Sequence, residues 1–292
     1  MGADFFMVRW CMRIVLATVS ILILPLTSLQ SQQVGSGSQH FPPIQELLGT
    51  PAAVALPTGT SDLRDSLRSE PTFKQTVRDL TSRSTSRRRS AVRRLGKKGK
   101  VRGIPYLGAV LLRTNTDPKT RADAAMSLGK IGHWKAVALL KESLGDPSVN
   151  IRFATALALG RVAANDAVTL LEEQGIRDTH WWVRYAATVA LGDTKHPAAV
   201  PALGHVLAHE MRWQVRQQAA RSLASFKGKY TIGLLTNALA DQDPSVRYTA
   251  AKSLGEIGGL QSLDALMAGL ETERDPLARE AIKSSMKIVV RK

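Results

Sequence analysis

The chain has 292 residues, of which 44% are hydrophobic and only 5% are aromatic, while alanine and leucine are plentiful. This composition favours a helical protein over a β-sandwich. The formal net charge is +16, from 40 Lys and Arg against 24 Asp and Glu, and a single cysteine excludes a disulfide framework within the chain.

The N-terminal segment is typical of a secretory signal. Arg9 and Arg13 precede an apolar run over residues 14–26, and a polar stretch rich in Ser, Gly and Gln follows. The run is shorter than the roughly 20 residues that span a membrane. We therefore expect residues 1–31 to be an export signal, with an uncleaved N-terminal anchor as the alternative. The candidate start residues are Met1, Met7 and Met12.

This signal predicts an extracytoplasmic protein, either periplasmic or secreted. Cys11 lies within it, so the mature chain has no thiol, which excludes thiolate metal sites and a cysteine nucleophile. Residues 32–61 are rich in Ser, Gly, Gln and Pro, which predicts a flexible linker. Residues 62–292 are the predicted folded domain, and it begins with an amphipathic helix over residues 62–80.

An internal repeat of about 32 residues runs through this domain. An arginine recurs at intervals of 33, 31, 32, 32, 31 and 32 residues, with a leucine seven residues after it in all but the last unit. The repeat arginines are Arg88, Arg121, Arg152, Arg184, Arg216, Arg247 and Arg279. A second apolar pattern keeps the same period and begins at Ile104, Val137, Val168, Val200, Ile232 and Leu263.

The apolar spacing inside each unit is helical, as in the series Val183, Ala187, Ala190 and Leu191. Asp-Pro pairs predict helix N-caps at Asp117, Asp146, Asp243 and Asp275. Glycines after the repeat leucine predict left-handed caps at Gly96, Gly129, Gly160, Gly192 and Gly255. Each unit is thus two helices that cannot bury their apolar faces alone. The predicted fold is all-α, a right-handed α-solenoid of about seven stacked helix pairs.

These features resemble the HEAT-repeat family, in particular the short repeats named after phycobilisome lyases. The matching residues are an acid in the turn, a Val-Arg pair, alanines and the Leu-Gly pair. The resemblance implies that the arginine-bearing helix is the second of each pair and lines the concave side. We interpret the acids six residues before the arginines as structural partners of neighbouring backbone or arginine. They are Asp146, Asp178, Glu210, Asp241 and Glu273.

Relatives of this repeat class include bilin lyases and an iron-dependent hydroxylase of a modified lysine, which binds its metal through several His-Glu pairs. This chain has one such pair, His209–Glu210. His205 and His209 are spaced to share a helix face and suit zinc, but the alternative is a pair of surface histidines near a helix C-terminus. We predict no catalytic residue, no cofactor and no metal. The alternative is an enzyme resembling the lyases or the metal-dependent hydroxylase, an oxidoreductase.

Residues 81–104 contain ten basic residues and no acidic one. A solvated face of the first repeat accounts for Arg88 but not for the density of the others, because like charges repel unless an anionic partner screens them. We predict an anionic-surface patch that acts as a basic tether. Nucleic acid is the default partner of an intracellular protein, whereas an exported protein meets anionic lipid, cell-wall polymer or acidic proteins instead. The residues of the patch are Arg87, Arg89, Arg93, Arg94, Lys97, Lys98 and Lys100.

Two tryptophans, Trp181 and Trp213, occupy equivalent positions three residues before their arginines. We predict that their indoles lie about 10 Å apart and form a ridge beside Arg212 and His180, suited to a protein or glycan partner. Trp182 is expected to fill a gap between repeats. Together, these features predict an exported, non-catalytic scaffold that binds a protein partner along its concave side.

Overall fold

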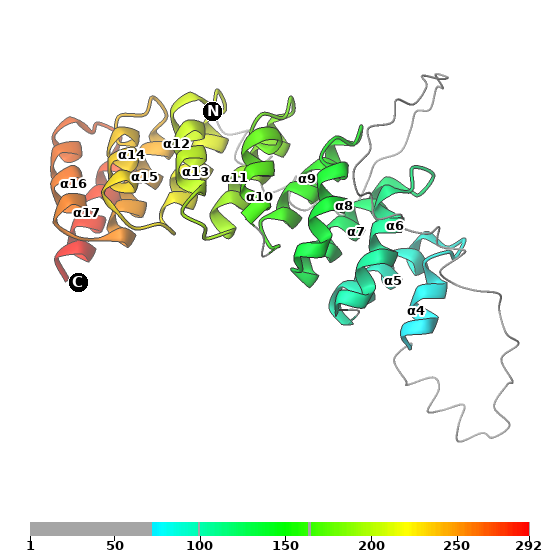
Figure 1. The fold of residues 1–292 in the computed structure, drawn as a ribbon. Coiled ribbons are helices and arrows are strands. Elements are labelled where there is room, and N and C mark those ends of the chain that lie inside the picture. The colour runs from blue at the N-terminus through cyan, green and yellow to red at the C-terminus, as the bar shows by residue number, and fades with distance from the viewer. Residues whose placement is uncertain (1–71, 99, 163–164, 292) are drawn as a thin grey trace, which may run out of the picture. The chain divides into compact units, whose positions relative to one another are not determined.

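The computed structural model describes residues 72–98, 100–162 and 165–291. Every regular element in these ranges is helical (Figure 1). None of the helices within these described ranges is long and apolar enough to cross a membrane. The predicted signal (1–31), the predicted linker (32–61) and residues 62–71 of the predicted first helix lie outside the described residues.

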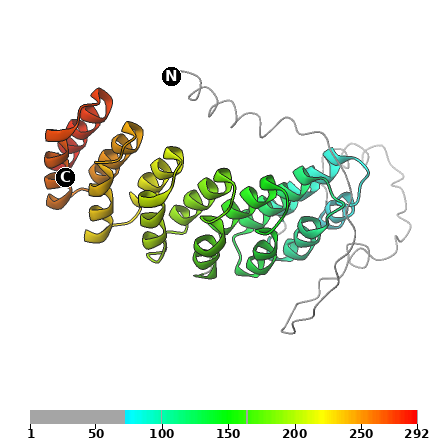
Figure 2. The ribbon, with the colours of Figure 1, turned by 90° about the horizontal axis from the view of Figure 1, so that it is seen from above.

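Seven helix pairs follow one another in chain order, and each lies beside the next (Figures 1 and 2). The first helices are α4 (Phe73–Asp79), α6 (Ile104–Leu112), α8 (Val137–Ser143), α10 (Asn165–Leu170), α12 (Ala199–His209), α14 (Lys229–Ala238) and α16 (Leu260–Thr272). The second, arginine-bearing helices are α5 (Thr85–Lys98), α7 (Pro118–Ile131), α9 (Val149–Leu159), α11 (Trp181–Asp193), α13 (Trp213–Leu223), α15 (Pro244–Ile257) and α17 (Pro276–Arg291). The prediction of an all-α solenoid of about seven pairs is confirmed.

Three short helical turns adjoin these pairs: 3-10 turns over Lys100–Gly103 and Trp134–Ala136, and a π-helical turn over Leu171–Gly175 that continues α10. The core is a continuous apolar layer between the first and second helices. The leucine seven residues after each repeat arginine is at most 1% exposed in six repeats: Leu95, Leu128, Leu159, Leu191, Leu223 and Leu254. Burying one such side chain stabilises the fold by about 1.5–3 kcal/mol.

Four of the five glycines after these leucines lie inside their helices, and Gly160 follows the end of α9 in a right-handed conformation, so the prediction of left-handed caps was wrong. None of them has a positive φ, and a left-handed cap occurs instead at Gly132, where φ is 67°. The missing side chain serves a different purpose, because it lets successive arginine-bearing helices approach closely. A Cβ atom added to Gly160 would lie 2.6 Å from the Cα of Ala190 in the next such helix.

Three of the four predicted Asp-Pro caps are confirmed. The Asp117 carboxylate accepts a hydrogen bond from a backbone N–H three residues later at 2.9 Å, and Asp243 and Asp275 bond the first turns of α15 and α17 in a similar way. Asp146 is the exception, because α9 is capped at Ser148. The Asp146 carboxylate accepts the Ser148 N–H at 2.8 Å within the turn and also binds an arginine of the preceding repeat.

Candidate functional site

A row of arginines and acids joins each repeat to the next. The Nε and Nη2 atoms of Arg184 donate to the Glu210 carboxylate of the following repeat at 2.6 and 2.9 Å. Its Nη1 donates to the carbonyl oxygen of Asp178 in its own turn at 3.0 Å. The other pairs across repeats are Arg88–Asp117, Arg121–Asp146, Arg152–Asp178, Arg216–Asp241 and Arg247–Glu273. We call this row the ladder, and in it the turn acids bind arginines of the preceding repeats.

The ladder lowers the pKa of four of its carboxyl groups, those of Asp117, Asp178, Glu210 and Glu273. Burial by itself raises the pKa of Asp178, but hydrogen bonds from Arg152 and from the His180 N–H outweigh it, so the pKa lies below its ordinary value of 3.8. Burial likewise raises the pKa of Glu210, and the hydrogen bonds from Arg184 bring it below 4.5. In turn, the bond to Glu210 raises the pKa of the Arg184 guanidinium.

These lowered pKa values predict a loss of stability in acid. A carboxyl group whose pKa is lower in the folded than in the unfolded chain stabilises the fold fully above its unfolded pKa, and this contribution disappears as the pH falls through the folded pKa. The free energy of unfolding in urea should therefore fall once the pH drops below about 4.5, the ordinary value for Glu. Glu210→Gln should show a shallower fall than the unchanged chain. An equal fall in both proteins would contradict a role for this pair.

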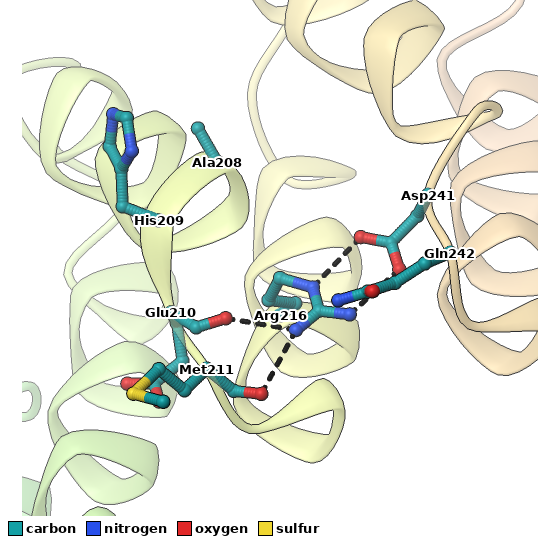
Figure 3. A pocket seen from close by; sticks show the side chains of 7 residues that line it. All are labelled: Ala208, His209, Glu210, Met211, Arg216, Asp241 and Gln242. Atoms are coloured by element: carbon teal, nitrogen blue, oxygen red, sulfur yellow. Dashed lines mark hydrogen bonds and ion pairs between the residues drawn. The ribbon is translucent and has the colours of Figure 1, made fainter.

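A shallow pocket of about 410 Å³ lies where the ladder passes from α12 to α13 (Figure 3). Its lining residues are Ala208, His209, Glu210, Met211, Arg216, Asp241 and Gln242. Figure 3 shows the Arg216 guanidinium between the Asp241 carboxylate and the backbone oxygens of Glu210 and Met211. Arg216 and Asp241 bind each other, and the Glu210 carboxylate is bound to Arg184 outside the pocket, so the pocket forms part of the ladder.

The histidines with the predicted metal spacing lie together, but their surroundings do not fit a metal site. The rings of His205 and His209 are 4.8 Å apart between centroids, and both residues are exposed. The neighbouring carboxylate of Glu210 is bound to Arg184. Over residues 72–98, 100–162 and 165–291, no three His, Cys, Asp or Glu side chains are grouped to hold a metal ion. The donors present do not match a centre built from several His-Glu pairs.

The predicted basic patch is partly neutralised within the fold. Arg89 and Arg93 lie 2.8 and 3.2 Å from the Asp123 carboxylate, and Arg94 lies 2.6 Å from Asp79. Three further patch residues are exposed and form no ion pair with another described residue: Arg87, Lys97 and Lys100. Lys98 is exposed as well. Part of the segment's charge therefore stabilises the first two repeats.

The tryptophans of the predicted ridge make a contact that the sequence pattern did not predict. The indole of Trp181 stacks on that of Trp182, with centroids 4.4 Å apart and an interplanar angle of 23°. The Arg212 guanidinium lies 5.8 Å from the Trp181 ring centroid, within the range of a cation–π interaction. His180 caps α11 by accepting the Trp182 N–H on Nδ1 at 3.3 Å, while Trp213 is half-buried against the core. The stacked pair is thus Trp181–Trp182.

A strip of apolar side chains extends from Trp182 across three arginine-bearing helices. Positions two before, one after and five after the repeat arginine share one face of these helices, because they are three or four residues apart. Trp182 contacts Phe153 of the preceding repeat and Tyr185 of its own helix, each with centroids 6.2 Å apart at 75°. Trp182 thus bridges two repeats as predicted, yet it is only half-buried. The members of this apolar strip, all half-buried, are Ala122, Met126, Phe153, Leu157, Trp182, Tyr185 and Val189.

Exposed cations lie at the C-terminal ends of α5 and α7 and just after α9, and on α13 and α15 they occupy the position that is apolar in the strip. They stand five or nine residues after the repeat arginine and form no ion pair with another described residue. Arg221 lies close enough to Tyr185 to oppose the rise in the phenol pKa that burial causes, and the Tyr185 hydroxyl donates to Gln218 Oε1 at 3.2 Å. We call these cations the basic row: Lys97, Lys130, Arg161, Arg221 and Lys252.

Neither the apolar strip nor the basic row could be predicted from a single sequence motif. The clearest signal for the apolar strip is the residue directly after the repeat arginine, which is Phe153, Tyr185 and Tyr248 in three repeats. That position becomes meaningful only when the buried and outward faces of the helix are known. The apolar strip is thus a half-buried apolar surface on three arginine-bearing helices, α7, α9 and α11.

Comparison with known proteins gives two family matches. The model for HEAT repeats matches residues 105–192 and 200–287, and the model for the PBS lyase HEAT-like repeat matches residues 183–209. Deoxyhypusine hydroxylase of Mus musculus is 38% identical over 68 residues, which are 23% of this chain and 22% of that protein. Deoxyhypusine hydroxylase-B of Oryza sativa subsp. japonica is 41% identical over 69 residues, 23% of each chain. The match therefore spans less than a quarter of these curated relatives.

Among solved structures, that of the Escherichia coli protein YibA aligns with a TM-score of 0.51 at 22% identity. The alignment covers 75% of this chain and 81% of that one. At this level of identity the similarity concerns the fold, which is the same kind of stacked helical array.

Proposed function

Because the chain belongs to the HEAT-repeat family, whose repeat model matches more than half of it, we propose that it is an exported, non-catalytic scaffold for a partner protein. The partner binds the outward face of the arginine-bearing helices in the middle repeats, that is, the face on which the apolar strip lies. The observation that carries this proposal is the apolar strip, a row of half-buried apolar side chains outside the core.

The apolar strip supports binding on energetic grounds. Each half-buried side chain still exposes apolar surface, and covering it contributes about 25 cal/mol per Å² removed from water. Tryptophan and tyrosine, both present in the strip, are the side chains most often found at energetic centres of protein interfaces. A partner that covers Trp182, Tyr185 and Leu157 would complete their burial.

Helix spacing supports the choice of this side of the array. Successive arginine-bearing helices meet backbone to backbone, as at Gly160 and Ala190, whereas the first helices meet through side chains, as where Leu139 faces Gly108. The arginine-bearing helices therefore approach each other more closely than the first helices do. In a curved stack, the helices that lie closer together form the inner side. The arginine-bearing helices are therefore expected on the concave side, as the family resemblance implies.

Site-specific photocrosslinking in cells tests the proposed surface. A photoreactive amino acid in place of Leu157 is expected to form a covalent adduct with a partner protein, because that side chain lies half-buried in the apolar strip. The same amino acid in place of Lys141, which is exposed on the first helix α8, serves as the control. Adducts of equal yield at both positions, or none at position 157, would argue against the proposal.

The same cells report on export, which rests on the charged and apolar pattern of residues 1–31. A protease that stays outside the cytoplasm should degrade an exported chain. A chain that stays intact under these conditions, while an exported control protein is degraded, would contradict export.

A second candidate function is an enzymatic activity related to that of the hydroxylases, and the identities of 38% and 41% over short segments favour it. The donor set at His205, His209 and Glu210 does not fit a metal centre, so we rank this candidate second. We expect purified full-length protein to contain metal far below one ion per chain. Stoichiometric iron or zinc that disappears in a His205→Ala, His209→Ala double variant would favour the enzyme instead.

A further inference from the structure

We infer that the partner presents an acidic segment with regularly spaced apolar anchors. The segment crosses the arginine-bearing helices from α7 to α13, with its apolar side chains on the apolar strip and its carboxylates on the basic row. This inference rests on the proposed function and names the chemistry of the partner of that same surface.

The apolar strip provides the binding surface for the apolar side chains of the partner. Its aromatic rings pack on one another, since Trp182 is stacked on Trp181 and stands edge to face with Phe153 and Tyr185. Such packing gives a continuous apolar surface with little conformational entropy to lose when a partner binds. Rings this closely packed have no spaces between them for separate bases or sugars to insert. The strip therefore suits aliphatic and aromatic side chains of a polypeptide.

The basic row provides the charge complementarity. On α7, α9 and α13 the cations Lys130, Arg161 and Arg221 lie beside the strip, exposed and without an ion pair to another described residue. On the outward face of α7 to α13, which comprises positions two before and one, five and nine after the repeat arginine, the only acidic residue is Asp193. The face thus combines an apolar centre with a cationic edge, and an acidic partner with apolar side chains complements both.

The spacing of the cations favours a polypeptide over a nucleic acid. Packed helices lie about 8–10 Å apart, so the basic row offers roughly one cation per such interval, and Asp193 interrupts it at α11. A nucleic-acid strand carries a charge about every 3.4 Å in a duplex and needs a denser track. Residues of a polypeptide seven apart in a helix, or three apart in an extended strand, are separated by about 10 Å and match the interval.

The test uses the full chain and a synthetic peptide of 20 residues, labelled with fluorescein, with Leu or Phe at every third or fourth position and Glu elsewhere. Fluorescence anisotropy should report binding, and an Arg161→Glu, Arg221→Glu double variant should weaken it about tenfold. The matched control, Lys141→Glu with Lys229→Glu, makes the same charge change at exposed residues of the first helices and should leave affinity unchanged.

A second pair of variants tests the apolar half of the proposal. Leu157→Ala should weaken peptide binding several-fold, whereas Leu263→Ala, an equally half-buried leucine on the first helix α16, should not. Thermal unfolding of each variant shows whether the fold is intact. A peptide of the same composition but without regular anchor spacing should bind less tightly than the regular one.

Three outcomes would overturn the inference. Peptide binding that is insensitive to both the charge reversal and Leu157→Ala would show that the peptide does not bind the apolar strip and the basic row. Tighter binding of an oligo-dT strand, or of phosphatidylglycerol vesicles, with the same sensitivity to the charge reversal would assign the surface to nucleic acid or to membrane instead. Photocrosslinking at position 157 without peptide binding would reject the acidic chemistry alone, whereas failure of both experiments would reject the proposed function as well.

Discussion

Gly160→Ala is expected to lower the free energy of unfolding by about 3 kcal/mol, because the added methyl group has no space. A Cβ atom at this position would lie 2.6 Å from the Cα and 2.7 Å from both the Cβ and the carbonyl oxygen of Ala190. Two of these atoms belong to the backbone and cannot rotate away. The helices α9 and α11 would have to separate, which would weaken the packing of two repeats.

The control for this prediction is the same substitution at Gly233 in α14, where an added Cβ would meet no atom within 4 Å. There we expect a gain of about 0.5–1 kcal/mol, because alanine has a higher helix propensity than glycine. Urea denaturation followed by circular dichroism measures both changes. The two variants should differ in sign, and a neutral Gly160→Ala variant would show that the helices have room to separate.

The second large effect is expected for Arg216→Ala, which removes the most enclosed guanidinium of the ladder. Arg216 is 4% exposed, and its Nε and Nη2 donate to Asp241 at 2.8 Å each. Its Nη1 donates to the carbonyl oxygen of Glu210 at 2.9 Å. The variant leaves the Asp241 carboxylate and the Glu210 carbonyl oxygen without these hydrogen-bond donors in a largely buried environment. We expect the free energy of unfolding to fall by about 3 kcal/mol.

Arg279 in the last repeat provides a matched control. It occupies the same repeat position and donates to the carbonyl oxygens of Leu270 and Glu273 at 2.9 and 3.0 Å, but it has no carboxylate partner among residues 72–98, 100–162 and 165–291. Arg279→Ala should therefore cost about 1 kcal/mol or less. Arg216→Lys should recover little of the loss, because a lysine ammonium cannot form the two-pronged contact with a carboxylate. Equal losses at both arginines would contradict the proposed importance of the cross-repeat pair.

The sequence predicted the architecture because its signals are local and repeated. An arginine, a leucine seven residues later and a matching apolar pattern recur with one period, so each repeat reports the same helix pair independently. Asp117, Asp243 and Asp275 cap helices as expected, since a cap depends only on residues within one turn. The acids six residues before the arginines were also identified correctly as structural.

Contacts between repeats were harder to infer, because they join residues about 30 positions apart that no local pattern pairs. Arg89 and Arg94 looked like free charge in the sequence, yet Asp123 and Asp79 bind them in the folded chain. The stacking of Trp181 on Trp182 was likewise not predicted from the repeat pattern.

The sequence by itself determined the fold class, the number of helix pairs and the positions of the repeat arginines and of five turn acids, because helical periodicity and turn chemistry act over a few residues. Only the tertiary structure decided that the repeat glycines make room for the next helix and that Glu210 is committed to Arg184. It also decided which apolar residues remain outside the core. Each of these depends on which faces of two helices meet, and that is set by packing between repeats.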